Sequence, residues 1–349
     1  MSIHASSNYT VTLDDNGHVW WFGLIFRDNG ETYTSEIPVQ IQGLENIIEI
    51  ACSSTFRLFL DSVGYVWYHG VLLQSSFTPV TKIDDFTNII HISCSNEYAI
   101  LLNDVGECFQ IKSKKSYYYG ELISVLKDIP CIIEISCGSS ASYMLSDTGE
   151  VYGFGSNTFL QLSNYYTEFG RHIQKIIFPE KIRKISAGSN HFLALSVSGT
   201  VWGIGSNFRG KLGNLIQSSK IGTPSEVIFP EHTFIVAVET GCDYSLALDI
   251  EGNLWIFGKF YKQVAIPKPI ILENIGDIET ICHGLSNGII IKTSDEIKCI
   301  YSAITANFGP ILNKSCKPKD RTWNPEYFDI IGSNPYWKQQ FKKIKSARK

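Results

Sequence analysis

Short stretches of this chain alternate between apolar residues and small or polar ones. The run 191–196, His-Phe-Leu-Ala-Leu-Ser, is followed by Gly199 and then by the run 200–205, Thr-Val-Trp-Gly-Ile-Gly. A period of two is typical of β-strands, and a Gly between two such runs favours a tight turn because Gly adopts a positive φ at little cost. The pattern therefore predicts a β-hairpin.

This hairpin pattern recurs along the chain at intervals of 42 to 53 residues from the second copy onward. If the Ile residues at 47, 89, 132, 182 and 235 are taken as origins, the turn Gly stands seventeen residues later and an aromatic residue twenty residues later. An origin just before residue 1 gives the same spacing for the first copy, whereas the origin at 278 has Asp295 and Lys298 at these positions. The predicted turn residues are Gly17, Gly64, Gly106, Gly149, Gly199 and Gly252. The aromatic positions, which we interpret as hydrophobic blade core, are Trp20, Trp67, Phe109, Tyr152, Trp202 and Trp255. Such self-similarity indicates seven copies of one structural unit.

Two further strands precede each hairpin. One has the form Ile-x-x-Ile, and before it comes a strand that contains Pro, as at Pro79 and Pro224. Pro lacks a backbone donor and so favours an outer edge strand. Four strands per copy are the content of one propeller blade, which predicts an all-β, seven-bladed β-propeller over residues 1–315.

We expect the ring to be closed by the two ends of the chain. The first copy lacks its leading strands, because the chain starts almost at the hairpin, and a further edge-strand pattern begins at Phe308. The strand over 308–315 is therefore predicted to complete the N-terminal blade, which removes the free edges.

The composition agrees with a strand-rich, folded protein. The chain has 349 residues with 46 Ile and only 12 Ala, and it is 44% hydrophobic and 18% charged. These proportions favour strands and exclude wholesale disorder. No apolar run reaches the length of a membrane-spanning helix and the N-terminus has no signal-peptide pattern, so we expect an intracellular protein, in nucleus or cytoplasm, that is not exported by a classical signal.

Nine Cys residues in a chain of this kind are expected to be reduced thiols. Cys52, Cys94 and Cys137 occupy one position of the repeat, which Ala187 and Thr240 fill in other copies. That position needs a small buried group, not a reactive one.

The segment from Ile185 to Gly213 resembles the regulator of chromosome condensation repeat. It holds Ala-Gly-x-x-His, the turn Gly, Val-Trp-Gly, and Gly-x-Asn-x-x-Gly-Lys-Leu-Gly, with Lys211 where the family has Gln. The fourth copy keeps Gln161-Leu of this ending, and the remaining copies keep only the hairpin. The resemblance covers roughly residues 1–315 and implies a divergent seven-bladed member. The family includes exchange factors for Ran-type small GTPases, chromatin-binding proteins, parts of ubiquitin ligases and interaction platforms, so the fold alone decides little.

Catalytic and metal-binding patterns are weak. Gly284-Leu-Ser286-Asn-Gly288 matches a serine nucleophile pattern, but an Ile-rich hairpin strand follows it where the motif needs a helix. The eight His residues are scattered, without metal spacing. We therefore expect no covalent catalysis, no metal and no cofactor.

Five residues are candidates for contact with a partner. Arg171, Arg209 and Lys211 lie on the longer connections, 156–175 and 206–225, and could meet an acidic partner surface. Asp243 lies in a loop between strands, where a solvated residue is the simpler interpretation. His191 occupies the family's His position, where a structural hydrogen-bonding role is favoured over catalysis.

The C-terminal segment is basic. Residues 314–349 carry ten Lys or Arg and three Asp or Glu, a net charge of +7, which leaves −11 for the rest of a chain whose total is −4. The basic end consists of Lys338, Lys342, Lys343, Lys345, Arg348 and Lys349. We assign 316–349 to an extension with a short helix from 336 to about 345. Nuclear targeting, nucleic-acid or nucleosome contact, a membrane-surface helix and a solubilising tail all remain open, as does packing of its aromatic stripe on the propeller.

Three functions compete at this point. The first is a non-catalytic protein-interaction platform, acting as a monomer. The alternative is a guanine-nucleotide exchange factor for a Ran-like small GTPase, which would disturb the Mg²⁺ and phosphate contacts by inserting a wedge. The second alternative is a chromatin-associated protein that uses the basic tail, although the acidic body disfavours DNA lying across it.

Overall fold

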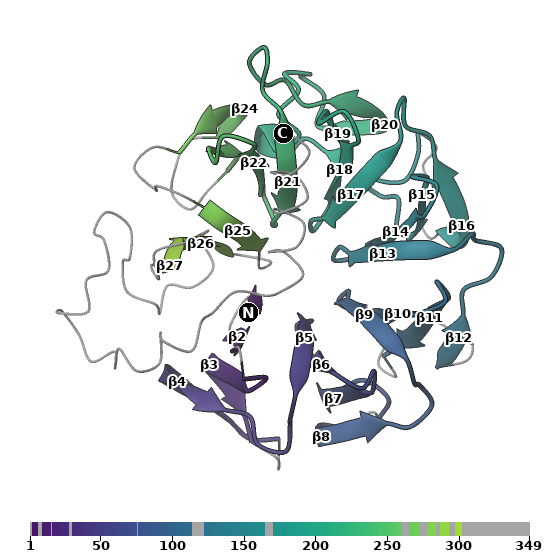
Figure 1. Ribbon diagram of the computed structural model, residues 1–349, viewed down its shortest axis with the longest axis vertical. Coiled ribbons are helices and arrows are strands. Elements are labelled where there is room, and N and C mark those ends of the chain that lie inside the picture. The colour runs from purple at the N-terminus through teal and green to yellow at the C-terminus, as the bar shows by residue number, and fades with distance from the viewer. Residues whose placement is uncertain are drawn as a thin grey trace, which may run out of the picture.

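A computed structural model describes residues 2–301 except 6–8, 15, 28–29, 75, 114–121, 165–169, 260–264, 273–277, 284–286 and 293–296. Over these residues the chain forms seven antiparallel sheets, six with four strands and one with three, arranged around a common centre (Figure 1). The predicted seven-bladed, all-β propeller is confirmed. Within the described part of the chain, no helix is long and apolar enough to cross a membrane.

Each sheet, or blade, begins at an inner strand beside the centre and ends at an outer strand. Blades 1 to 4 are β1 (Ser2–Ala5), β2 (Tyr9–Leu13), β3 (Val19–Phe26) and β4 (Thr32–Gln40); β5 (Ile47–Cys52), β6 (Phe56–Asp61), β7 (Val66–Gly70) and β8 (Thr78–Ile83); β9 (Ile89–Cys94), β10 (Tyr98–Asn103), β11 (Cys108–Lys112) and β12 (Ile123–Val125); and β13 (Ile132–Cys137), β14 (Ala141–Ser146), β15 (Val151–Gly155) and β16 (Gly170–Ile176). Blades 5 to 7 are β17 (Ile182–Ala187), β18 (His191–Ser196), β19 (Val201–Ser206) and β20 (Lys220–Glu226); β21 (Ile235–Thr240), β22 (Tyr244–Asp249), β23 (Leu254–Gly258) and β24 (Ile266–Ile271); and β25 (Ile278–His283), β26 (Asn287–Lys292) and β27 (Ile297–Tyr301).

The order of strands corrects where the repeat unit begins. The Pro-containing strands are outer strands, as predicted, but each follows its hairpin in the same sheet: Pro79 lies in β8, which pairs with β7. A blade therefore starts at the Ile-x-x-Ile strand and ends at the Pro-containing strand. The sequence analysis had assigned that strand to the following copy.

The first blade is complete without the C-terminus. Its inner strand is β1 and its outer strand is β4, so the expectation that the first copy lacks its leading strands was wrong. Residues 308–315 lie outside the described residues, and their place in the ring stays a prediction. Among the described strands, the blade without a fourth strand is the seventh, whose inner strand β25 lies against β1.

The hairpin turns show why Gly occupies the repeat position. The six predicted turn Gly residues have φ between +78° and +96°. At Gly64 an added Cβ would lie 3.0 Å from the Cα of Asn88, and the Gly64 carbonyl accepts a hydrogen bond from the Ile89 backbone N–H at 3.1 Å. The turn of one blade is thus packed against the start of the next, where only Gly fits both the backbone angle and the space.

The hydrophobic core lies between neighbouring blades. One cluster joins Leu58 and Leu60 of β6 to Ile92 of β9 and Leu101 of β10, all of them buried. A single four-stranded sheet cannot bury both of its faces, so each blade is stabilised by its neighbours. The rigid ring that results fixes the loops at its two faces.

Candidate interaction site between the fifth and sixth blades

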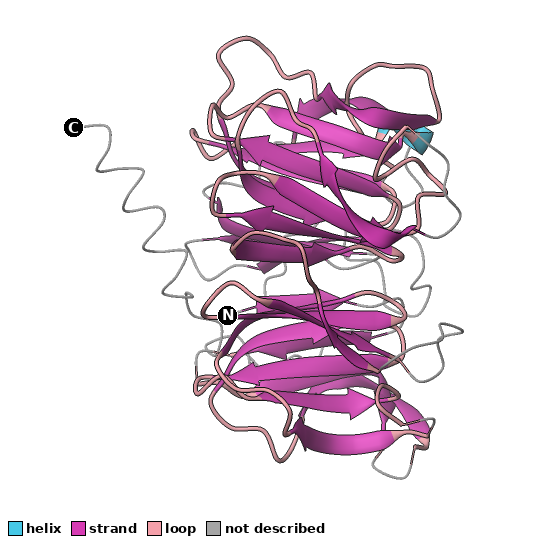
Figure 2. Cartoon of the chain, turned by 90° about the vertical axis from the view of Figure 1, so that its right-hand side faces the viewer, coloured by secondary structure: helices cyan, strands magenta, loops and turns pink. Residues whose placement is uncertain are grey.

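The strand directions place two neighbouring loops on the same face of the ring. Because antiparallel strands alternate in direction, the first–second and third–fourth connections of every blade emerge on one face, which we call the loop face. The third–fourth connection of blade 5 spans 207–219 and the first–second connection of blade 6 spans 241–243. In the edge-on view the short 3₁₀ turn η1 (Phe208–Gly210), which belongs to the first of these connections, lies at one side of the disc (Figure 2).

Asn207 organises the long loop of blade 5. Its Oδ1 accepts a hydrogen bond from the Leu212 backbone N–H at 3.1 Å, and its Nδ2 donates to the Ile216 carbonyl at 2.8 Å. Asn157 makes the corresponding bond to the Leu162 N–H at 2.8 Å in blade 4. The family's Gly-x-Asn pattern therefore supplies a buried amide that holds the loop, a role that the sequence analysis did not assign.

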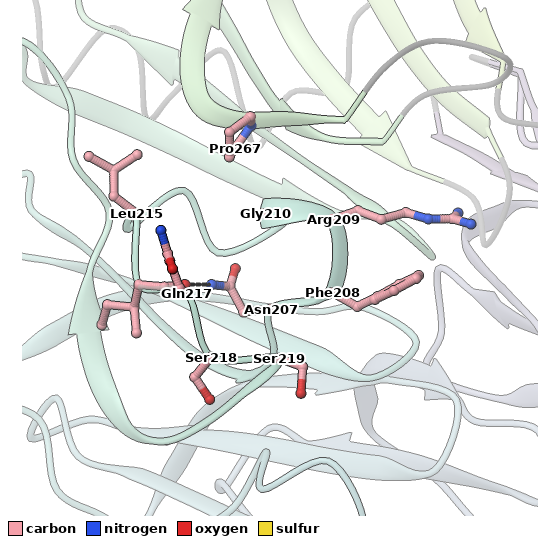
Figure 3. Close-up of a pocket in the computed structure, with 10 residues that line it drawn as sticks. Asn207, Phe208, Arg209, Gly210, Leu215, Gln217, Ser218, Ser219 and Pro267 are labelled. Carbon is pink, nitrogen blue, oxygen red and sulfur yellow. Dashed lines mark hydrogen bonds between the residues drawn. The ribbon is translucent and has the colours of Figure 1, made fainter.

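A groove of about 530 Å³ lies between η1 and the segment 215–219 (Figure 3). Its apolar side chains Phe208, Leu215 and Ile216 are 55%, 46% and 45% exposed. Pro267 of blade 6 closes one side, so close that a Cβ on Gly210 would lie 2.4 Å from its Cα. Exposed apolar residues on a rigid, polar-rimmed loop are typical of an interaction surface.

Three of the sequence-predicted candidates meet beside this groove. Arg209 Nη1 donates to Asp243 Oδ2 at 2.7 Å, and Lys211 Nζ donates to Asp243 Oδ1 at 3.2 Å and to the Cys242 carbonyl at 3.0 Å. The Lys211 side chain is only 2% exposed, whereas those of Arg209 and Asp243 are about one-third exposed. This inter-blade ion cluster carries two positive charges and one negative charge.

Asp243 is thus an ion-pair partner and not merely a solvated loop residue. Arg209, whose φ is +67°, also places its guanidinium carbon 4.8 Å from the centroid of the Phe208 ring. In Figure 3 the two side chains extend in the same direction from η1. The geometry presents a cation beside an exposed aromatic ring.

His191 belongs to the structural part of the same assembly. Its Nε2 lies 2.9 Å from the Ser245 hydroxyl of blade 6, and that hydroxyl donates to the Lys211 carbonyl at 2.8 Å. Tyr98 and Ser142 form the corresponding pair between blades 3 and 4, also at 2.9 Å. The His position of the repeat therefore links adjacent blades.

The other candidates are not brought to this site. Arg171 lies in β16, and its side chain is outside the described part of the chain. The six basic residues of the tail, from Lys338 to Lys349, also lie outside the described residues. The interpretation of the tail stays a prediction.

A set of charged residues between inner strands was not among the candidates predicted from the sequence. Glu49 of β5 pairs with His91 of β9, and Glu134 of β13 pairs with Lys184 of β17 at 2.6 Å. These residues share one position of the repeat, the second after each Ile origin, and that shared position was the signal in the sequence. In Figure 1 the strands that carry them border the centre of the ring.

The thiols of the repeat are poor nucleophiles. Burial raises the pKa of Cys52 to about 12 and that of Cys137 to about 11. Since the thiolate is the reactive form, these groups are inert at neutral pH. Ser286 lies outside the described residues, and β25 and β26 on either side of it pair as a hairpin, where the serine nucleophile motif needs a helix.

The closed ring of antiparallel sheets makes this protein a β-propeller. Two models of the regulator of chromosome condensation (RCC1) repeat match within residues 132–248, one over 132–161 and 182–211 and the other over 148–195 and 198–248. Residues 132–248 therefore hold divergent repeats of this family. No curated protein sequence matches it significantly.

Solved structures support the same architecture. Prp20p from Saccharomyces cerevisiae, described with its binding properties to Gsp1p and histones, is similar with a TM-score of 0.69, 17% identity, and coverage of 81% of this chain and 80% of that one. Yeast RCC1 (Prp20) bound to Kap60 gives a TM-score of 0.71 at 17% identity, with 84% and 81% coverage. Human WBSCR16 has a TM-score of 0.66 at 17% identity, with coverage of 77% of this chain and 80% of that one. At such low identity these likenesses show the fold alone.

Proposed function

We propose that this propeller is a non-catalytic protein-interaction platform that binds its partner through the loop face of blades 5 and 6. The observation that carries the proposal is the groove beside η1, which is lined by exposed Phe208, Leu215 and Ile216 together with Arg209. The presence of repeats of this family supports a protein-interaction role in general. The excess of positive charge in the ion cluster favours a partner surface with acidic residues around an apolar centre.

The test compares two faces of the same molecule. Immobilised wild type, a Phe208→Ser/Leu215→Ser variant and a Val63→Ser variant are exposed to a lysate of nucleated cells, and retained proteins are quantified by mass spectrometry. Val63 is a matched control because it is an apolar residue at least as exposed as Phe208 and Leu215 but lies on the β6–β7 turn at the opposite face. We expect at least one protein to be lost about tenfold from the groove variant and kept by the control variant. Identical retention by all three proteins would contradict the proposal.

The alternative is exchange-factor activity toward a Ran-like GTPase. The likeness to Prp20p, whose description includes binding to Gsp1p, favours it. The described loop 207–219 holds a 3₁₀ turn and no strand pair, so its described residues offer no inserted hairpin as a wedge. Release of a mant-labelled nucleotide from Ran-like and Rab-like GTPases tests this alternative. Acceleration that Arg209→Ala abolishes would support it, and no acceleration at micromolar protein would reject it.

Chromatin association is the second alternative, and it depends on the basic tail. The description of Prp20p includes histones, and residues 314–349 carry a net charge of +7. Binding through Lys and Arg to phosphates weakens steeply with salt. Salt-dependent DNA or nucleosome binding that is lost on deletion of 334–349 would support this function, and unchanged binding would reject it.

A further inference from the structure

Arg57 is a buried cation in an aromatic enclosure between blades 1 and 2. It is the second residue of β6, and its side chain is fully buried. The guanidinium carbon lies 4.1 Å from the ring centroid of Tyr9 and 4.7 Å from those of Trp21 and Phe26. Three rings of blade 1 therefore surround a charge that belongs to blade 2.

Among the described residues, the guanidinium has no hydrogen-bond acceptor. Its Nε, Nη1 and Nη2 are all buried without a partner there, and no carboxylate in that part of the chain forms an ion pair with it. Cation–π contacts with desolvated rings return about 2 kcal/mol. A buried charge whose hydrogen bonds are unmade costs several kcal/mol, so the rings alone do not compensate for its burial.

Two other polar atoms in the same cluster are also buried without a partner among the described residues. They are Trp21 Nε1 and His69 Nδ1. His69 pairs with Arg57 across the hairpin of β6 and β7, and its ring lies 5.2 Å from that of Trp21. The unpartnered groups thus form one contiguous set toward the loop face.

The repeat shows that Arg57 is a special feature of this one blade junction. The same position holds Thr10, Ala99, Ser142, Ser245 and Gly288 in other blades, and the bulky Phe192 in blade 5. Where the residue is Ser, it accepts or donates one bond to the Tyr98 or His191 of the preceding blade. The architecture therefore does not require a cation at this position.

We propose that Arg57, Trp21 and His69 bind a small oxyanion, of the phosphate or carboxylate class, between blades 1 and 2. The indole N–H and the guanidinium are donors only, and the imidazole can also donate. A set of donors around a permanent positive charge selects an anion with several oxygen acceptors, and the planar guanidinium fits such a group in a bidentate manner.

The state of His69 agrees with this assignment. Burial and the charge of Arg57 lower the pKa of His69 to about 3, so the imidazole is neutral at neutral pH. A bound anion would partly cancel the field of Arg57 and would accept a bond from the ring. Binding should therefore raise the pKa of His69.

The first experiment is thermal unfolding with inorganic phosphate or acetate, each compared with chloride at equal ionic strength. A ligand that binds only the folded state raises Tm by mass action, so wild type should gain roughly 3 °C or more at saturating phosphate or acetate. Arg57→Met keeps the packing volume and removes the donors, and it should abolish the gain. General salt effects act on both proteins, so an equal rise in both, or no rise in wild type, would overturn the proposal.

A second measurement needs no folded Arg57 variant. The imidazole resonances of wild type are titrated by NMR with and without phosphate, and His69→Gln assigns the His69 signal. An upward shift of the His69 pKa in phosphate, with the exposed His172 unchanged, is the expected result. If His69 titrates identically with and without phosphate, the oxyanion site does not exist. In the thermal experiment at neutral pH, a response to phosphate alone would identify a phosphate group as the ligand, and a response to both phosphate and acetate would identify oxyanions in general.

Discussion

The carboxylate of Asp249 accepts a hydrogen bond from the indole N–H of Trp255, with 2.8 Å between Oδ2 and Nε1. Its Oδ1 accepts the backbone N–H groups of Glu251 and Asn253 at 2.9 and 2.8 Å, which fixes the β22–β23 turn. Asp14 with Trp20 and Asp61 with Trp67 repeat the arrangement, each at 3.0 Å. The aromatic position of the repeat therefore has a polar function in addition to its hydrophobic packing.

Removal of this acceptor should destabilise the protein. Asp249→Ala leaves the buried indole N–H and two turn amides without partners, which we expect to lower the free energy of unfolding by about 1–3 kcal/mol. Asp104→Ala is the matched control, because Asp104 is an exposed neighbour of the equivalent turn residue Asn103 in blade 3. Chemical denaturation followed by Trp fluorescence measures both. Equal stability of the two variants would show that the turn does not depend on the carboxylate.

Much of the fold could be predicted because the repeat positions have local physical causes. The turn residues need positive φ and the outer strands tolerate Pro, and both are visible in the sequence of one copy. The residue at which each blade begins was not predictable from the pattern, because a repeat that closes into a ring has no unique starting point. Only the pairing of β3 with β4 and of β7 with β8 decides where a blade ends.

The candidate site, like the fold, was predictable from the sequence only in part. Arg209, Lys211 and Asp243 were each identified by charge and by their place in loops, but the ion pairs join residues more than 30 positions apart. Such pairing depends on the packing of two blades and is not contained in either segment. Arg57 was overlooked because a single charged residue in a strand carries no motif, and only comparison of its position between copies marks it as unusual.

The Lys211–Asp243 ion pair should show strong coupling in a double-mutant cycle. Asp243→Ala leaves a buried ammonium group without its carboxylate, and we expect a loss of about 3 kcal/mol in the free energy of unfolding. Lys211→Met in addition removes the buried charge and should recover part of that loss. Denaturant unfolding of the wild type, both single variants and the double variant gives the coupling energy. If the losses in unfolding free energy of the two single variants add up to that of the double variant, the charge of Asp243 is stabilised by solvent and not by Lys211.

The contact between Glu49 and His91 should make stability depend on pH. Burial of His91 and the positive charge of Lys184 both lower the pKa of the imidazole. The carboxylates of Glu49 and Glu134 raise it by more, so the pKa of His91 lies above its ordinary value of 6.5. A raised pKa in the folded state stabilises the protein fully below that ordinary value, and the contribution is lost as pH rises through the folded pKa.

The measurement is the difference in unfolding free energy between wild type and His91→Gln from about pH 5.5 to about pH 8.5. We expect this difference to decrease as pH rises. His172→Gln, at an exposed position, is the matched control substitution. A difference that is constant or grows with pH would contradict the assigned direction of the shift.

Two glycines of blade 6 separate backbone strain from steric conflict. Gly252 in the β22–β23 turn has φ +90° and no atom within 4 Å of an added Cβ, whereas Gly258 at the end of β23 has φ +93° and the Asp243 carbonyl oxygen 2.5 Å from that position. Gly252→Ala should cost about 1–2 kcal/mol from the backbone angle alone. Gly258→Ala has a similar backbone angle and must in addition displace a backbone group, which should add about 1–3 kcal/mol.

The Gly258→Ala substitution should also move Asp243 away from Arg209. Any partner binding through the groove should therefore be weakened by Gly258→Ala and unaffected by Gly252→Ala. Denaturant unfolding measures both variants. If the two substitutions lower the unfolding free energy equally, the loop 241–243 moves without resistance and does not hold the ion cluster in place.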